Sequence, residues 1–172
     1  MRTVSLLGSL LLFPAEPVLA QDLPADSVRV QVDGQSAWLG RAALSGLRWD
    51  SVAITRPGEA PRMFTGVPLR AVLALGGYAP GRLRGPALAS AFRVGAQDGY
   101  VVAFGVAELD SALVGHAMLL AFAVNGAPLS AEDGPWRLVI PSDHHSARWV
   151  RQVTSVSIEA GARRAAPETG GS

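Results

Sequence analysis

The chain has 172 residues, of which 49% are hydrophobic and 17% charged, enough for one globular domain with its own core. Its 15 basic residues, all arginine, nearly balance 14 acidic ones, and a net charge of +1 argues against a nucleic-acid-binding protein. Cysteine is absent, which excludes disulfides, thiolate nucleophiles and sites in which cysteine holds zinc, iron–sulfur clusters, molybdenum or copper.

The N-terminus has the features of a secretory signal peptide. Arg2 supplies a positive charge, residues 4–13 are almost wholly apolar, and Val18 and Ala20 are suitably small residues before a cut. We predict a signal peptide over residues 1–20, cleaved after Ala20, and therefore a periplasmic or secreted protein. The apolar run is too short to span a bilayer, so no membrane attachment is expected after cleavage.

Short strands separated by glycine and proline turns follow from residue 27. Val28, Val30 and Val32 alternate with polar residues, which is the period of a half-buried strand, and Asp33-Gly34 predicts its turn. The expected strands are residues 27–32, 37–39, 49–55, 61–64, 92–96, 100–104, 119–124, 137–140 and 153–158.

Short helices are expected in three places. Residues 40–47 form one candidate, and a second begins after Pro68 and stops at Gly76-Gly77. A third would carry Trp149 and Val150, with Asp143 as its N-cap. These elements predict an α+β domain over residues 27–159, made mainly of short mixed β-strands with two or three short helices, and a disordered tail at residues 160–172.

Four strings in chain order carry a family resemblance. They are FTGVPL at residues 64–69, DGY at 98–100, NGAPL followed by DGPWRLVIP at 125–129 and 133–141, and SARWVR at 146–151. In this order the chain resembles the oxidoreductase molybdopterin-binding domain, the fold of sulfite oxidase, plant nitrate reductase and the periplasmic methionine sulfoxide reductase catalytic subunit. The resemblance covers roughly residues 28–158 and implies a sulfite-oxidase-like fold and molybdopterin, the molybdenum cofactor, as a ligand.

One departure from that family concerns the metal. Catalytic members bind molybdenum through a cysteine upstream of the segment that matches GVPL. The corresponding stretch, residues 52–63, offers Thr55, Arg56 and Arg62, and none of these can replace a soft thiolate. The leading hypothesis is therefore a non-catalytic module that binds a pterin or another small anionic ligand.

Two other functions remain open at this point. The chain could be a molybdopterin-dependent oxidoreductase whose metal has only pterin sulfurs and oxo or water ligands. It could instead be a periplasmic adaptor that binds a partner protein through Trp38, Trp49 or Trp136 on its surface.

The first candidate cofactor-binding residues lie near the C-terminal end of the domain. Arg148 and Arg151 are three apart and would share a helix face, where guanidinium groups can clamp a phosphate or carboxylate. The resemblance places two basic residues near the cofactor phosphate at this point; alternatively, both arginines are solvated stems that cover Trp149. His144 or His145 would line the pocket as a donor or proton carrier. Because adjacent side chains diverge, no metal site is predicted for this pair.

Asp98 and Tyr100 are further candidates, on the resemblance alone. Their alternative interpretation is a turn aspartate and a half-buried strand tyrosine. Arg137 lies between apolar neighbours and, if buried, needs a carboxylate partner, for which Asp133 is one candidate.

Overall fold

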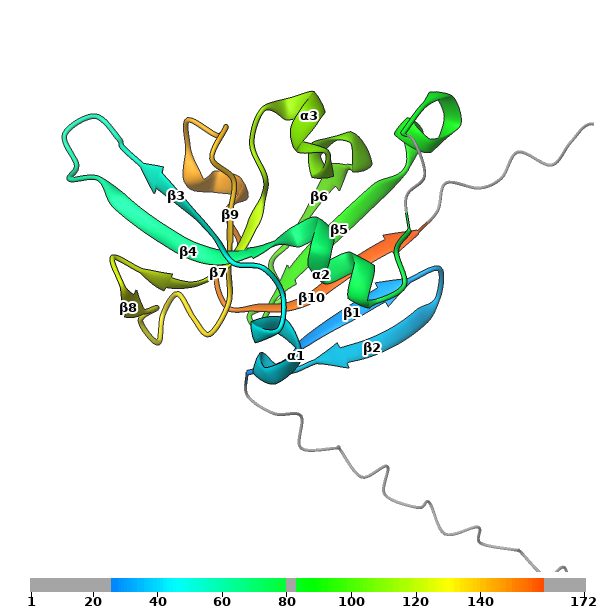
Figure 1. The fold of residues 1–172 in the computed structure, drawn as a ribbon, viewed down its shortest axis with the longest axis horizontal. Helices are drawn as coiled ribbons and strands as arrows, with labels where there is room; N and C mark the ends of the chain where they lie inside the picture. The colour runs from blue at the N-terminus through cyan, green and yellow to red at the C-terminus, as the bar shows by residue number, and fades with distance from the viewer. Residues whose placement is uncertain (1–25, 80–82, 160–172) are drawn as a thin grey trace, which may run out of the picture.

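The computed structural model describes residues 26–79 and 83–159. The predicted signal peptide at 1–20 and the predicted tail at 160–172 lie outside the described residues. Two five-stranded sheets form the body of the domain (Figure 1). No helix within the described ranges is long and apolar enough to cross a membrane.

The first sheet joins the two ends of the domain. Its central pair, β1 and β10, is parallel, whereas the other pairs are antiparallel, so the sheet is mixed. The β1–β2 turn is Asp33-Gly34, and both residues have positive φ, as the sequence pattern predicts. In spatial order the strands are β2 (Gln35–Leu39), β1 (Val28–Val32), β10 (Val153–Glu159), β5 (Ala91–Ala96) and β6 (Val101–Gly105).

The second sheet is antiparallel and is centred on β7. A Cβ at Gly66 would overlap the backbone of Leu120 and Ala121, so the close approach of β4 to β7 requires glycine at this place in the FTGVPL string. In spatial order the strands are β3 (Asp50–Ile54), β4 (Arg62–Pro68), β7 (Leu119–Val124) and β8 (Ala127–Pro128), and β9 (Arg137–Val139) also pairs with β7.

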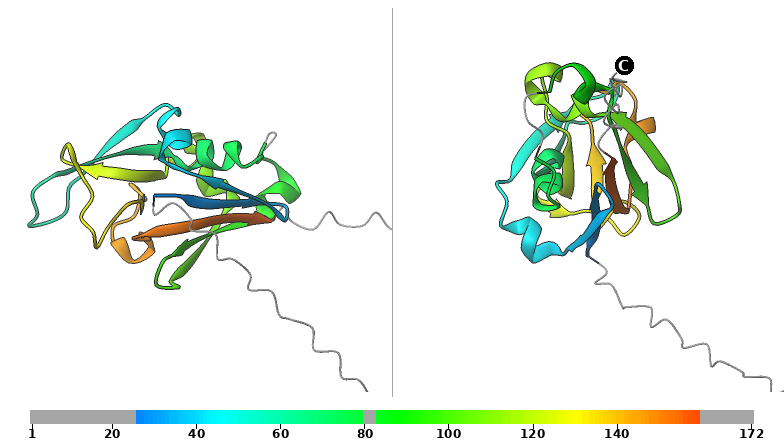
Figure 2. Two further views of the ribbon diagram at one scale, coloured as in Figure 1. Left: turned by 90° about the horizontal axis from the view of Figure 1, so that it is seen from below. Right: turned by 90° about the vertical axis from the view of Figure 1, so that its right-hand side faces the viewer.

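Helix α2 (Leu69–Leu75) contacts both sheets. It begins directly after Pro68 and buries Leu69, Val72 and Leu73, and it packs against β1 and β4 (Figures 1 and 2). The other α-helices are α1 (Arg41–Ser45) and α3 (Ser111–Val114), and the 3-10 helices are η1 (Gly85–Ala89), η2 (Val106–Leu109) and η3 (Ser146–Arg148).

The core lies between these elements. Its largest fully buried side chains include Trp136, Phe64 and Phe92, from the second and first sheets. Burial of this apolar surface is the main driving force of folding. The predicted α+β class, with short mixed strands and few short helices, is confirmed.

One predicted helix differs in type from the element that the structure shows. The segment before Trp149 forms only the 3-10 helix η3, whose N-cap is His145 without a side-chain cap. Asp143 does not cap it, because its carboxylate accepts hydrogen bonds from Arg148. Trp136, which the adaptor hypothesis named as one possible surface tryptophan, is 1% exposed and therefore cannot serve that role.

Candidate functional site

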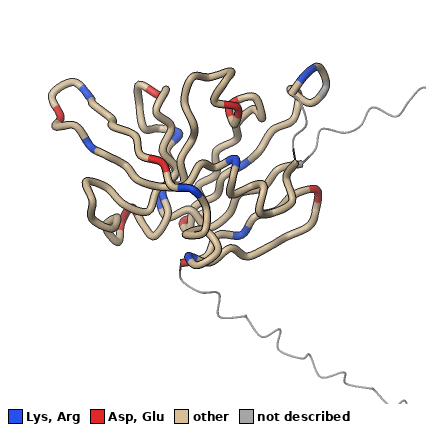
Figure 3. Tube along the Cα trace, viewed as in Figure 1, with Lys and Arg blue, Asp and Glu red and all other residues tan. Residues whose placement is uncertain are grey.

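A pocket of about 820 Å³ opens where the second sheet meets the β5–β6 turn and the segment that leads into β10. We call it the arginine pocket. Basic and acidic residues are interspersed along the described trace (Figure 3), and the pocket lining likewise combines three arginines with three carboxylates. The lining residues are Arg62, Ala96, Asp98, Tyr100, Glu132, Asp133, Arg137, Ser146, Ala147, Trp149, Arg151 and Gln152.

Arg137 on β9 is the most buried charge of the pocket, with 9% of the residue exposed. Its Nη1 lies 2.5 Å from Oδ2 of Asp133, the partner that the sequence pattern suggested. Burial lowers the pKa of Arg137, and the carboxylate of Asp133 opposes this shift. The nearby positive charges of Arg62 and Arg151 lower the pKa further, by less than Asp133 raises it.

The guanidinium groups of Arg62 and Arg137 lie against aromatic rings, and both approach Oδ2 of Asp133. Arg62 lies 5.0 Å above the ring of Phe64, and Arg137 lies 5.9 Å from that ring and 5.7 Å from the ring of Trp149. The two rings meet edge to face at 5.7 Å. Arginine is suited to such stacking because its planar guanidinium is weakly hydrated.

Arg56 extends this series behind the pocket wall. Its Cζ lies 4.8 Å from the ring of Trp149, and its Nη1 donates to Oγ of Ser146 at 3.3 Å. It belongs to the stretch in which catalytic relatives carry the metal-binding cysteine. The guanidinium is a cation and an obligate donor at neutral pH, so it cannot ligate a metal.

Three buried donors of this cluster lack a hydrogen-bond partner among the described residues. They are Nη2 of Arg56, Nε of Arg137 and Nε1 of Trp149. A buried polar group without a partner costs about 1–3 kcal/mol, so native proteins rarely leave several together without a ligand or water. The side chains of Arg137 and Trp149 both line the pocket, but these two nitrogen atoms have almost no accessible surface and do not face its open space.

Asp98 and Tyr100 form the wall contributed by the β5–β6 turn. Oδ1 of Asp98 accepts the backbone N–H of Tyr100 at 2.9 Å, which is the turn role weighed from the sequence. The hydroxyl of Tyr100 donates to the carbonyl oxygen of Ala147 at 2.7 Å, and 48% of Tyr100 remains exposed. The turn is thereby tied to η3 on the other side of the pocket.

The structure separates the two arginines that were expected to share a helix face. Helix η3 ends at Arg148, and Arg151 follows in a bend, so the helical spacing does not apply. Arg151 lines the pocket and forms no salt bridge with the described residues. The adjacent Gln152 has φ of 47°, which is rare for a residue with a side chain and redirects the chain into β10.

Arg148 lies outside the arginine pocket. Its Nη2 and Nε donate to the carboxylate of Asp143 at 2.5 and 3.1 Å, and its Nη1 donates to Glu108 at 2.9 Å. The hydrogen bonding of Arg148 to the carboxylate of Asp143, which accepts from it, is the main reason that the pKa of Arg148 is raised. Two carboxylates already satisfy this guanidinium, so it does not join Arg151 in one clamp.

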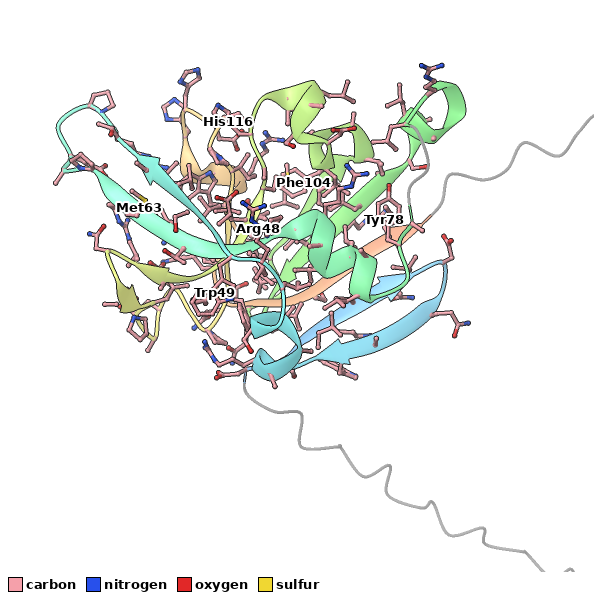
Figure 4. All side chains as sticks on the ribbon, viewed as in Figure 1. Arg48, Trp49, Met63, Tyr78, Phe104 and His116 are labelled. Atoms are coloured by element: carbon pink, nitrogen blue, oxygen red, sulfur yellow. The ribbon has the colours of Figure 1, made fainter. Side chains whose placement is uncertain are left out.

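The histidines are likewise absent from the pocket lining. His144 and His145 are exposed, in the turn before η3. His116 is exposed near the start of β7 (Figure 4) and borders a small recess beside Glu108. Among the described residues, no group of three or more His, Asp or Glu side chains could hold a metal ion.

Sequence reasoning did not assign Arg62, Trp149 or Glu132 to the site. Arg62 and Arg137 are far apart in the chain and meet only because β4 and β9 both pair with β7. The usable signal was an arginine within an apolar strand, since a buried charge usually has a partner or a function.

The pocket offers donors and charge rather than a nucleophile. Its arginine N–H groups can bind the oxygens of a phosphate or carboxylate, and paired guanidinium donors favour such planar or tetrahedral anions. The partly exposed side chains of Arg62 and Arg151 therefore suit an anionic group that enters the pocket. The metal-binding part of a pterin cofactor has no thiolate available to it from this chain.

Comparison with known proteins identifies the same fold. The family model described as the oxidoreductase molybdopterin binding domain matches residues 20–165. No curated protein matches the chain. The structure of the sulfane dehydrogenase SoxCD from Paracoccus pantotrophus is similar, with a TM-score of 0.61 and 18% identity over 81% of this chain and 40% of that chain. At this identity the likeness shows a shared fold, and the chain spans less than half of its SoxCD counterpart.

Proposed function

The chain belongs to the oxidoreductase molybdopterin-binding domain family, and on that premise we propose that its arginine pocket binds a small anionic ligand, such as the phosphate of a pterin. The protein is exported by its N-terminal leader and acts as a binding or accessory module. It does not perform the cysteine-ligated molybdenum chemistry of its catalytic relatives.

The observation that carries this proposal is Arg151, an exposed arginine of the pocket lining that forms no salt bridge with the described residues. It adds a charge that no described carboxylate neutralises. Burial is the main cause that lowers the pKa of Arg137, and the charges of Arg62 and Arg151 add to it, so an anion in the pocket would favour the charged guanidinium.

If the ligand is molybdopterin, this chain can account for only part of its usual environment. Arg62 and Arg151 would hold its phosphate, and in catalytic relatives the bound cofactor supplies oxygen-atom transfer at molybdenum. Thr55, Arg56 and Arg62 stand in the stretch where those relatives carry the thiolate, and they supply no sulfur. Binding without cysteine-ligated redox chemistry is the function that these residues support best.

The family match over residues 20–165 favours one other function, an oxidoreductase in which the pterin sulfurs alone hold the metal. The two functions differ in what the purified protein contains and does. An adaptor role has a separate basis in Trp38 and Trp49, which are 44% and 53% exposed (Trp49 is labelled in Figure 4).

The test is to isolate the exported protein from the periplasm of a host that makes molybdopterin, and to measure bound phosphorus, pterin and molybdenum. We expect pterin or another phosphorylated ligand in the wild type, little molybdenum, and no oxygen-atom transfer. Arg151→Gln should reduce the bound ligand, whereas Arg93→Gln, an exposed arginine on β5 outside the pocket, should not.

Two results would overturn the proposal. Stoichiometric molybdenum together with turnover of an oxo-transfer substrate would establish the oxidoreductase instead. Protein that neither retains a phosphorylated ligand nor binds added inorganic phosphate in competition with sulfate would rule out the anion site.

A further inference from the structure

We propose that a second pocket of this domain binds a small aromatic carboxylate, that is, one apolar ring that carries a carboxylate on a short chain. We call it the aromatic pocket. It shares no lining residue with the arginine pocket, so this inference does not depend on the proposed anion site. The lining residues are Arg41, Ala42, Ser45, Trp49, Phe122 and Trp136.

The aromatic pocket lies between α1 and β7. Helix α1 buries Leu44 in the core and carries Arg41 and Ser45, four residues apart, on a face that lines the pocket. Trp49 follows this helix (it is labelled in Figure 4), and Phe122 belongs to β7. The pocket volume of about 460 Å³ is within the range of sites that hold small organic molecules.

Two aromatic rings form the apolar wall of the pocket. The rings of Trp49 and Phe122 meet edge to face, with their centroids 4.9 Å apart and an angle of 67° between their planes. Trp49 is 53% exposed and Phe122 is only partly buried, so both present apolar surface to water. A planar apolar ligand can stack on one of these rings and meet the other edge-on. Removal of this surface from water favours binding.

Trp136 supports this wall from behind rather than by contact with a ligand. It is 1% exposed, and its ring lies edge to face with Phe122 at 6.1 Å and 5.1 Å from Cζ of Arg41. Its Nε1 donates to the carbonyl oxygen of Asp26 at 3.1 Å. The buried indole therefore holds Phe122 and Arg41 in place before any ligand binds.

Arg41 supplies the charge of the aromatic pocket. Its Nε donates to Oδ2 of Asp26 at 3.1 Å, whereas its Nη1 and Nη2 have no hydrogen-bond partner among the described residues. The Arg41 side chain is 49% exposed, so a ligand can reach these two donors, unlike the buried Nε of Arg137. The Nη1 and Nη2 groups on one edge of a guanidinium match the two oxygens of a carboxylate. An aromatic ring against Trp49 with its carboxylate toward Arg41 uses both features of the pocket.

The ligand pair that tests this site is 3-phenylpropionate and its neutral analogue 3-phenylpropionamide. The two compounds share the ring and the chain and differ in the charged group. Binding to the full exported protein can be followed by tryptophan fluorescence, since Trp49 lies at the site, and by calorimetry. Because hydrogen bonds between charged groups are strong, we expect the acid to bind about tenfold more tightly than the amide.

Two variants with matched controls separate the charge from the rings. Arg41→Gln should make the two affinities equal, and it should fold normally because the lost ion pair with Asp26 is half exposed. Arg29→Gln, an exposed arginine on β1 outside the pocket, is its control. Trp49→Ala should weaken both compounds about tenfold, whereas Trp38→Ala, which removes a tryptophan of 44% exposure outside the pocket, should weaken neither.

Several results would overturn this inference. They are equal affinities of the wild type for the acid and the amide, a preference that survives in Arg41→Gln, and affinities that Trp49→Ala leaves unchanged. A wild type that self-associates and becomes monomeric in Trp49→Ala would make this face an interface between copies of the chain, and would overturn the ligand too. Phosphate binding at the arginine pocket should be unchanged in both variants, and its loss would show that the two pockets are not independent.

Discussion

Arg148 and Arg151 are three residues apart, yet the fold gives them opposite surroundings. Arg148 donates hydrogen bonds to both Asp143 and Glu108, and it ties η3 to η2. Arg151 lines the pocket, where Arg137 and Trp149 keep unsatisfied donors. The same residue type therefore serves the fold in one place and is available to a ligand in the other.

The difference shows which feature of an arginine indicates a binding role. Hydrogen-bonding capacity is equal in the two residues, so the distinction lies in whether the protein already supplies the acceptors. Arg137 combines both situations, because Asp133 holds its Nη1 while its Nε remains free. Each prediction below changes one of these arrangements.

The largest expected effect is that of Arg137→Met. The substitution keeps an apolar stem but leaves Asp133 without its closest partner, and breaking a buried ion pair costs about 3 kcal/mol or more. Chemical denaturation should show this loss in the free energy of unfolding, and ligand binding should disappear. A variant as stable as the wild type would mean that the pair does not support the fold.

The sequence predicted the strands better than it predicted the site. Alternation placed β1 within a residue of its observed ends, because a half-buried strand must carry its apolar side chains with a period of two. A continuous apolar run that ends before Asn125-Gly126 placed β7 at its observed ends. The pairing of β1 with β10 and the meeting of β4, β9 and the β5–β6 turn depend on contacts between distant segments. No local pattern encodes those contacts.

The site residues show the same limit. Asp98, Tyr100 and Arg151 were predicted and do line one pocket, whereas Arg148 was predicted and lies elsewhere. The helix that would have aligned Arg148 with Arg151 does not extend past residue 148. Asp143 was predicted to cap a helix, whereas its carboxylate accepts hydrogen bonds from Arg148, which also donates to the distant Glu108.

The next largest effect is expected for Arg151→Gln. The change removes a charge with no described salt-bridge partner, so the free energy of unfolding should change little. Affinity for inorganic phosphate should fall about tenfold, the equivalent of roughly 1.4 kcal/mol, as for the loss of one charge-assisted contact. Calorimetry and denaturation on the same sample separate the two quantities.

Arg148→Gln should give the reverse pattern. The free energy of unfolding should fall by about 1 kcal/mol, because the network is lost but 41% of the Arg148 side chain is exposed and already screened by water. Phosphate affinity should be unchanged. Reduced affinity at unchanged stability would place Arg148 at the ligand and would contradict the division between the two arginines.

A change in salt concentration should produce the smallest effect, and it should distinguish the ion pairs of Arg148 from the ion pair of Arg137 with Asp133. At an ionic strength near 1 M the Debye length is about 3 Å, against about 10 Å at 0.1 M, so the partly exposed Arg148 pairs should be weakened while the buried Arg137–Asp133 pair is protected. The stability difference between wild type and Arg148→Gln should therefore shrink by a few tenths of a kcal/mol between these salt concentrations.

The stability difference between wild type and Arg137→Met should stay the same, because only 10% and 17% of the two paired side chains are exposed. Equal salt sensitivity of both differences would show that the pocket arginine is as open to solvent as Arg148.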